Sequence, residues 1–313
     1  MDNLIGIFIA VLPPFLLLGV GAFARSVGWL RAEADASLSM VTIRILYPSF
    51  ILFHILENGN TKLDGATILM IAFGFASILI GFFLAWFASK VFRIEEESVR
   101  TFRFCAGIFN YGFIAIPVAL AFFDSNIVVH IILFNLGVEI AIWTIGILIL
   151  TASKLSLKGL LNPPAIAVIV GLVLKTTGGK QLIPSFFWEV VEILGQCSIP
   201  IGLLLIGGSF YQLMDNFRFS NGLRTEIASL LVRNLFFPCL VISFIASNFC
   251  PTDIPFLREV LVIQAAMPAG IFAVVIVSNY SANSVTAMRT ISVTMLASLL
   301  TLPIWLSIGF AVL

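Results

Sequence analysis

The stretch AGIFNYGFIAIPV, residues 106–118, lies inside an apolar segment long enough to span a membrane and interrupts it in the middle. Gly112 allows backbone angles that other residues avoid, and Pro117 removes a backbone donor and clashes with the preceding turn. Asn110 adds a side-chain amide that hydrocarbon cannot satisfy. An interruption of this kind is tolerated at membrane depth where the backbone lines a cavity enclosed by protein.

A second interrupted stretch, QAAMPAGIFA at residues 264–273, lies in the other half of the chain. One alternative is that Pro117 and Pro268 only kink helices packed against neighbours. Two interrupted spans in corresponding positions of two halves instead point to the binding site of a secondary transporter. Each break would place a half-helix N-terminus, with its partial positive charge, beside the site.

Composition settles the class of protein. Of the 313 residues, 60% are hydrophobic and 11% are charged, whereas a soluble domain is about one quarter charged. The apolar blocks are too long for a β-barrel, so we expect an all-α polytopic membrane protein. At roughly 20 residues a span, the chain holds about ten helices. The apolar N-terminal run is interpreted as the first of these and not as a signal peptide.

The polar segment 152–162 divides the chain into residues 1–151 and 163–313, with five expected spans in each. An odd number of spans gives the halves opposite orientations, which is the arrangement of inverted repeats. Basic residues are concentrated in alternate loops, including Lys154 and Lys158 of the linker. These loops are expected to be cytoplasmic, which leaves both termini outside the cytoplasm of a cell (inner) membrane protein.

Glu139 is the charged residue deepest within an apolar span, and it follows Asn135 by four residues on one helix face. An intramembrane carboxylate can carry a proton, hold Na⁺ or pair with an arginine. The alternative of a structural ion pair with Arg233 or Arg289 is left open here.

The sequence favours no catalytic class. It contains no P-loop, HExxH or GxSxG motif, so neither an enzyme nor an ATP-driven pump is indicated. Its four cysteines form no framework and its two histidines are far apart, which argues against a metal site. A net charge of +1 gives no indication of a nucleic-acid partner, and no cofactor is expected.

Several stretches together resemble one family. They are IFNYGFIAIP at 108–117, EIAIWTIGI at 139–147 and VIQAAMPAGIF at 262–272. Essentially from end to end, the chain is similar to the auxin efflux carrier family, the bacterial relatives of plant PIN auxin transporters in the bile acid/Na⁺ symporter-like superfamily. The family pattern usually has Thr where this chain has Tyr111, and PIN-like members tend to have Gln where it has Glu139.

The resemblance implies ten helices in two inverted five-helix repeats, with helices 4 and 9 crossing at their broken midpoints. Helices 1, 2, 6 and 7 would form a scaffold that often dimerises. Helices 3–5 and 8–10 would form a bundle that moves past the scaffold like an elevator. Substrates of the family are organic anions such as malate, malonate and indole-3-acetate.

We therefore expect a carrier that binds a carboxylate at the crossing, with H⁺ or Na⁺ coupling or uniport all open. A channel and an intramembrane enzyme are less favoured, and a receptor that binds an organic anion without transporting it is the main alternative. The expected substrate-binding residues come from both interrupted spans and from the helix with the buried carboxylate: Asn110, Tyr111, Gly112, Pro117, Asn135, Glu139, Gln264, Pro268 and Gly270.

Overall fold

The computed structural model describes residues 2–57, 64–151, 163–215, 223–247 and 249–313, and the regular elements within these ranges are helices. The predicted linker 152–162 lies outside the described residues. The all-α prediction is confirmed. Among the described residues, seven helices are long and apolar enough to cross a membrane: Ile5–Ser26, Ala32–Glu57, Gly65–Val91, Asn126–Thr151, Ser185–Gln212, Arg224–Ala246 and Ser284–Phe310.

One group of helices is built around α1 (Asp2–Ser26) and α10 (Ser185–Asp215), which pack along each other. A Cβ at Gly21 would lie 2.1 Å from the Leu204 carbonyl oxygen, and a Cβ at Gly207 would lie 2.0 Å from that of Leu18. Glycine is needed at both positions because the two backbones touch. The group also holds α2 (Ala32–Val41), α3 (Tyr47–Glu57) and α9 (Pro163–Thr177).

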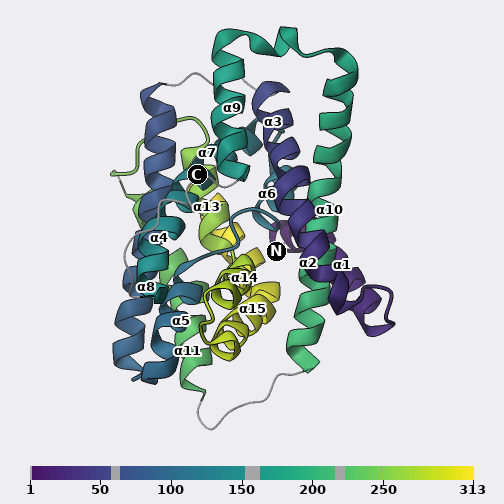
Figure 1. Ribbon diagram of the computed structural model, residues 1–313. Helices are drawn as coiled ribbons and strands as arrows, with labels where there is room; N and C mark the ends of the chain where they lie inside the picture. The colour runs from purple at the N-terminus through teal and green to yellow at the C-terminus, as the bar shows by residue number, and fades with distance from the viewer. Residues whose placement is uncertain (1, 58–63, 152–162, 216–222, 248) are drawn as a thin grey trace.

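A second group is built around α4 (Gly65–Val91) and α7 (Asn126–Ala141). Glycines again bring the helices together, since a Cβ at Gly74 or Gly137 would lie within 2 Å of a carbonyl oxygen on the facing helix. Figure 1 shows α4, α5 and α8 on one side of the molecule, α1, α2 and α10 on the other, and α13 to α15 between them. Three further helices belong to the second group: α11 (Arg224–Leu230), α12 (Phe237–Ala246) and α15 (Ser284–Phe310).

Both predicted interruptions are present. The first separates α5 (Glu96–Gly107) from α6 (Ala115–Phe122), and the second separates α13 (Leu257–Ala266) from α14 (Phe272–Asn279). The two breaks meet each other as a short antiparallel bridge between Phe109 and Ala269. The Asn110 N–H donates to the Pro268 carbonyl at 2.8 Å, and the Gly270 N–H donates to the Ile108 carbonyl at 3.0 Å. Each break thus satisfies backbone groups that the other leaves open.

The two prolines differ in position. Pro268 lies within the second break, as predicted, and contributes its carbonyl to the bridge. Pro117 lies in the first turn of α6, where a missing N–H is tolerated. It therefore lies within the helix that follows the break and does not line the break itself.

Three helices contain a wider π-helical segment that the sequence did not predict: η1 (Thr42–Leu46), η2 (Ile142–Gly146) and η5 (Leu231–Phe236). Segment η1 joins α2 to α3, η2 joins α7 to α8 (Ile147–Thr151), and η5 joins α11 to α12. Segments of this kind occur frequently at functional sites in helices. Segments η1 and η5 both carry residues that matter below.

Candidate functional site

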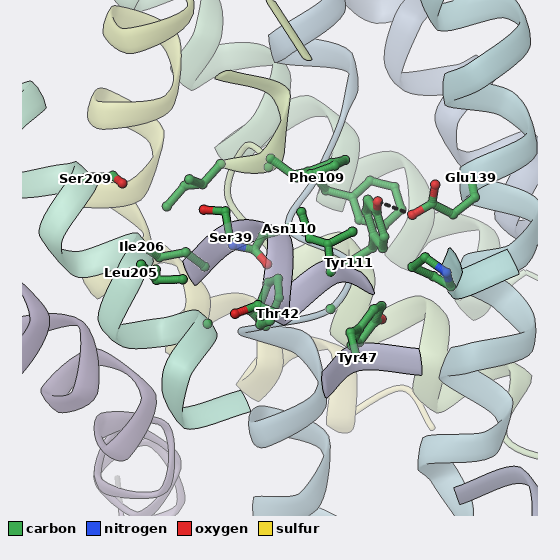
Figure 2. Close-up of a pocket in the computed structure, with 18 residues that line it drawn as sticks. Ser39, Thr42, Tyr47, Phe109, Asn110, Tyr111, Glu139, Leu205, Ile206 and Ser209 are labelled. Atoms are coloured by element: carbon green, nitrogen blue, oxygen red, sulfur yellow. Dashed lines mark hydrogen bonds between the residues drawn. The ribbon is translucent and has the colours of Figure 1, made fainter. Parts of the chain in front are cut away.

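A cavity of about 120 Å³ lies where the two breaks face η1 and α10. This is roughly ten times the room that a single water molecule needs, which suits a small organic molecule. Figure 2 shows Ser209 and Glu139 at opposite sides of the labelled residues, with Asn110 between them. The lining residues come from six segments of the chain: Ser39, Thr42, Ile43, Tyr47, Phe109, Asn110, Tyr111, Gly112, Phe113, Glu139, Pro164, Gly202, Leu205, Ile206, Ser209, Gly270, Ile271 and Phe272.

Most of the predicted site residues converge here. The cavity is lined by Asn110, Tyr111, Gly112, Glu139 and Gly270. A much smaller cavity beside it, which shares Tyr111 and Glu139, is lined by Asn135. The other three predicted residues are absent from the wall of the larger cavity: Pro117, Gln264 and Pro268.

Asn110 is 5% exposed and joins the end of the break to the next helix. Its Oδ1 accepts from the Ile114 N–H at 3.4 Å, which occupies one of the free amides at the start of α6. The side chain of Asn110 also lines the cavity. Asn110 therefore brings an amide donor to the cavity while its oxygen supports the half-helix.

Glu139 is held by two donors from different elements. The Tyr111 hydroxyl donates to Oε1 at 2.5 Å, and the Trp143 Nε1–H donates to Oε2 at 2.8 Å. The Tyr111 bond, drawn as a dashed line in Figure 2, ties the first break to α7. Both carboxylate oxygens thus have a partner at the edge of the cavity.

The two arginines considered as ion-pair partners of Glu139 bind other groups. Arg289 pairs with Glu226 through Nε at 2.6 Å and Nη2 at 2.8 Å. Arg233 donates from Nη1 to the Gly107 carbonyl at 3.4 Å. The two donors described for Glu139, Tyr111 and Trp143, are neutral.

Asn135 and Gln264 fix the shape of the first break. The Asn135 Nδ2 donates to the Tyr111 carbonyl at 2.8 Å, and the Gln264 Nε2 donates to the same oxygen at 3.2 Å. Gln264 also donates to the Asn135 Oδ1 at 3.3 Å. These two side chains hold the backbone of Tyr111 in place, so their role is to position the site.

The sequence did not predict the part of the cavity wall that comes from the span Ala32–Glu57 and from α10. Ser39, Thr42 and Tyr47 line the cavity around η1, and Ser209 lines it from α10. The Tyr47 ring lies 5.7 Å from the Phe113 ring, centroid to centroid. A signal was present, since three polar side chains spaced along one apolar span are unusual, but the π-helical turn that directs them is not visible in sequence.

The backbone at Gly112 leaves room for Tyr47. A Cβ at Gly112 would lie 3.2 Å from the Tyr47 hydroxyl oxygen, which is closer than ordinary contact. A side chain at this position would press on the Tyr47 hydroxyl, whereas the backbone of Gly112 is not in the left-handed region that its prediction from backbone freedom suggested.

Comparison with known proteins agrees with this architecture. Residues 6–156 and 147–306 match a family model described as "Membrane transport protein". An uncharacterized transporter of Methanocaldococcus jannaschii is 24% identical over 94% of this chain and 96% of its own length. An uncharacterized transporter of Methanothermobacter thermautotrophicus is 21% identical over the same shares of the two chains. The chain belongs to the auxin efflux carrier family of membrane transport proteins.

Proposed function

We propose that this protein is a secondary carrier for small organic anions, namely carboxylates such as malate, malonate or auxin-like acids. The observation that carries the proposal is the cavity at the paired breaks, into which Asn110 brings an amide donor. Carboxylates bind well to amide donors and to helix N-termini. The first turns of α6 and α14 follow Phe113 and Ile271, which both line the cavity.

One positive charge near the cavity, that of Arg233, supports an anionic substrate beside the Glu139 carboxylate in the wall. Phe109 lines the cavity, and the guanidinium carbon of Arg233 lies 5.2 Å from the centroid of its ring. A guanidinium stays protonated in proteins, and its field is weakly screened in a medium of low dielectric constant. An anion in the cavity would therefore be stabilised by the positive charge of Arg233, which lies on the other side of the Phe109 ring.

The walls of the cavity support an elevator mechanism. One wall comes from η1 and α10 in the first group of helices, and the other comes from the breaks and α7 in the second group. If the second group slides against the first, the breaks carry their ligand with them while η1 and α10 stay behind. Transport would then alternate access without opening a continuous pore.

The same division fits ten helices in two inverted repeats. The seven long helices, the shorter α9 and the two interrupted pairs supply that number. The scaffold would hold α1, α2 with α3, α9 and α10, and it would form the homodimer. The transport bundle would hold the rest. Both termini would lie on the extracytoplasmic side of the inner membrane.

Glu139 is the proposed coupling group. A bound carboxylate would bring a second negative charge to a cavity that Glu139 already lines. Two like charges in a site disfavour each other's ionised form. Entry of the anion would therefore favour protonation of Glu139, and the proton would move with the substrate.

The test is a current measurement on purified protein in liposomes, with mono- and dicarboxylates and indole-3-acetate at two pH values. We expect a saturable response to at least one anion that disappears in Asn110→Ala. The matched control is Asn126→Ala, because Asn126 begins α7 and does not line the cavity. Equal responses from Asn110→Ala and the wild type would contradict the assignment of the site.

A receptor that binds the anion without transport is the second candidate. It predicts thermal stabilisation by an anion that produces neither a current nor exchange of labelled ligand across the membrane. The cavity alone fits both candidates, and the family and its transporter relatives favour the carrier.

A further inference from the structure

Arg233 is a fully buried arginine beside the crossing of the two breaks. Its side chain is 1% exposed and belongs to η5. The guanidinium carbon lies 3.9 Å from the centroid of the Phe237 ring and 5.2 Å from that of Phe109. Its Nη1 donates to the Gly107 carbonyl at 3.4 Å, at the point where α5 ends.

The surroundings of this charge are unusual. The described residues offer no hydrogen-bond partner to its Nε or its Nη2, and its contacts are a carbonyl and two aromatic faces. A buried charge without a carboxylate partner is costly inside a membrane protein. The C-terminus of a helix carries partial negative charge, and aromatic faces attract cations. Arg233 is thus stabilised by the groups that would stabilise a bound cation at the end of α5.

Three carbonyl oxygens of the crossing accept hydrogen bonds from donors of the chain. The Ile108 oxygen accepts from Gly270, and the Pro268 oxygen accepts from Asn110. The Tyr111 oxygen accepts from the side-chain amides of Asn135 and Gln264. Freed carbonyls of broken helices are the oxygens that hold Na⁺ in carriers of this general build. Here protein N–H groups donate to these three oxygens, and the Arg233 guanidinium donates to the Gly107 oxygen beside them.

We propose that Arg233 is a resident cation that takes the place of a coupling Na⁺ at the crossing, so that transport requires no Na⁺. This rests on the proposed function, since it names the coupling of the same site. Phe109 lies between the guanidinium and the cavity, which makes Arg233 a positioning residue that acts on the anion through the field and through the end of α5. Because the positive charge of Arg233 belongs to a side chain, it moves with the protein during transport. Glu139 is then the group that couples the anion to protons.

The first arm of the test needs no substrate. Thermal unfolding of the purified protein is compared in NaCl and KCl at equal ionic strength. The wild type should unfold at the same temperature in both salts. Arg233→Gln removes the charge, leaves space beside the Gly107 carbonyl and supplies an amide oxygen. We expect this variant to be less stable and to gain about 2–4 °C in Na⁺ over K⁺, the shift that about 1 kcal/mol of binding produces.

Two variants control this arm. Arg233→Lys keeps a cation in place and should show no preference for Na⁺. Arg258 also binds backbone carbonyls, with its Nη2 donating to Val312 at 2.8 Å, but it lies away from the crossing. Arg258→Gln should lose stability without any response to Na⁺, which separates the crossing from the loss of an arginine in general.

The second arm measures flux of a labelled anion by counterflow, in NaCl and in choline chloride. Equal flux in the two salts supports the inference, and flux that requires Na⁺ overturns it while the proposed carrier function stands. Specific stabilisation of the wild type by Na⁺ would also overturn it, as would an Arg233→Gln variant that folds and ignores Na⁺. If Arg233→Gln does not fold, the inference is still tested by the wild type alone: by its unfolding temperature in NaCl and KCl, and by its flux in NaCl and choline chloride. If no anion is transported at all, the proposed function fails. The comparison of thermal unfolding in Na⁺ and K⁺ then still tests the role of Arg233.

Discussion

The two breaks share a backbone arrangement and differ in chemistry. The bridge pairs Phe109 of the first break with Ala269 of the second, next to Asn110-Tyr111-Gly112 on one side and between Pro268 and Gly270 on the other. Each break donates one N–H to a carbonyl of the other. The first break adds an amide and a phenol, whereas the second adds no polar side chain between Met267 and Ile271.

Their surroundings differ in the same way. The first break faces Glu139 and Trp143 across a chain of hydrogen bonds that ends at the cavity. The second break is tied inward, because the Ala269 N–H donates to the Thr294 hydroxyl at 3.2 Å in a fully buried setting. The comparison teaches that backbone hydrogen bonds between the two breaks form the crossing, and that the polar side chains of the first break give one half of it a different chemistry.

Asn110→Ala should have the largest effect on ligand affinity. It removes the amide donor that we assign to the anion, and a hydrogen bond to a charged group is worth about 1.5–3 kcal/mol. Affinity should fall roughly 10- to 150-fold, measured by titration calorimetry on purified protein. Asn126→Ala should bind as the wild type does. Unchanged affinity in Asn110→Ala would remove the distinction between the breaks.

Glu139→Gln should abolish the pH dependence of transport. Glutamine has a similar shape and does not titrate, and its single amide oxygen accepts from either the Tyr111 hydroxyl or the Trp143 N–H. Flux into liposomes, measured on either side of neutral pH, should become equal at the two values. Glu192→Gln on α10 is the control, because that carboxylate is exposed and bonded to Gln196. A pH dependence that survives in Glu139→Gln would place the coupling group elsewhere.

Thr294→Val tests the supporting role of the second break. It leaves the Ala269 N–H buried without an acceptor, which costs about 1–3 kcal/mol of unfolding free energy. The melting temperature should fall while ligand affinity stays within about twofold. Thr294→Ser keeps the hydroxyl and should melt close to the wild type. A large loss of affinity at unchanged stability would show that the second break contacts the ligand.

Ile271→Val should have the smallest effect. Ile271 lines the cavity from the second break and offers only apolar contact. Loss of one methylene group costs about 0.5–1.5 kcal/mol at a fully buried site. Only a part of that cost would appear in the free energy of ligand binding. Affinity should change by about twofold in calorimetry, well below the change in Asn110→Ala. Similar losses in the two variants would mean that both breaks bind the ligand alike.

Local sequence features predicted the crossing well. Asn110, Gly112 and Pro268 are each unfavourable in a continuous membrane helix, so their clusters located both interruptions. The spacing of Asn135 and Glu139 placed both side chains toward the first break, because residues four apart share a helix face. These inferences depend on neighbours in sequence and on the cost of polar groups in hydrocarbon.

Features that depend on packing between distant segments could not be predicted. The partner of Arg289 is Glu226, 63 residues away on another helix, and no local pattern selects it over Glu139. The contributions of Ser39, Thr42 and Tyr47 require the π-helical turn η1, whose extra residue is not encoded by a recognisable motif. The burial of Arg233 likewise follows from η5 and from its two aromatic neighbours.

The most direct test of the central claim is counterflow of a labelled carboxylate into liposomes that hold a high concentration of the same unlabelled anion. This assay needs no net charge movement, so it also detects electroneutral exchange. The account predicts transient accumulation of label with the wild type and none above background with Asn110→Ala. An anion that binds and stabilises the wild type, yet shows no counterflow, would contradict the carrier and identify a receptor.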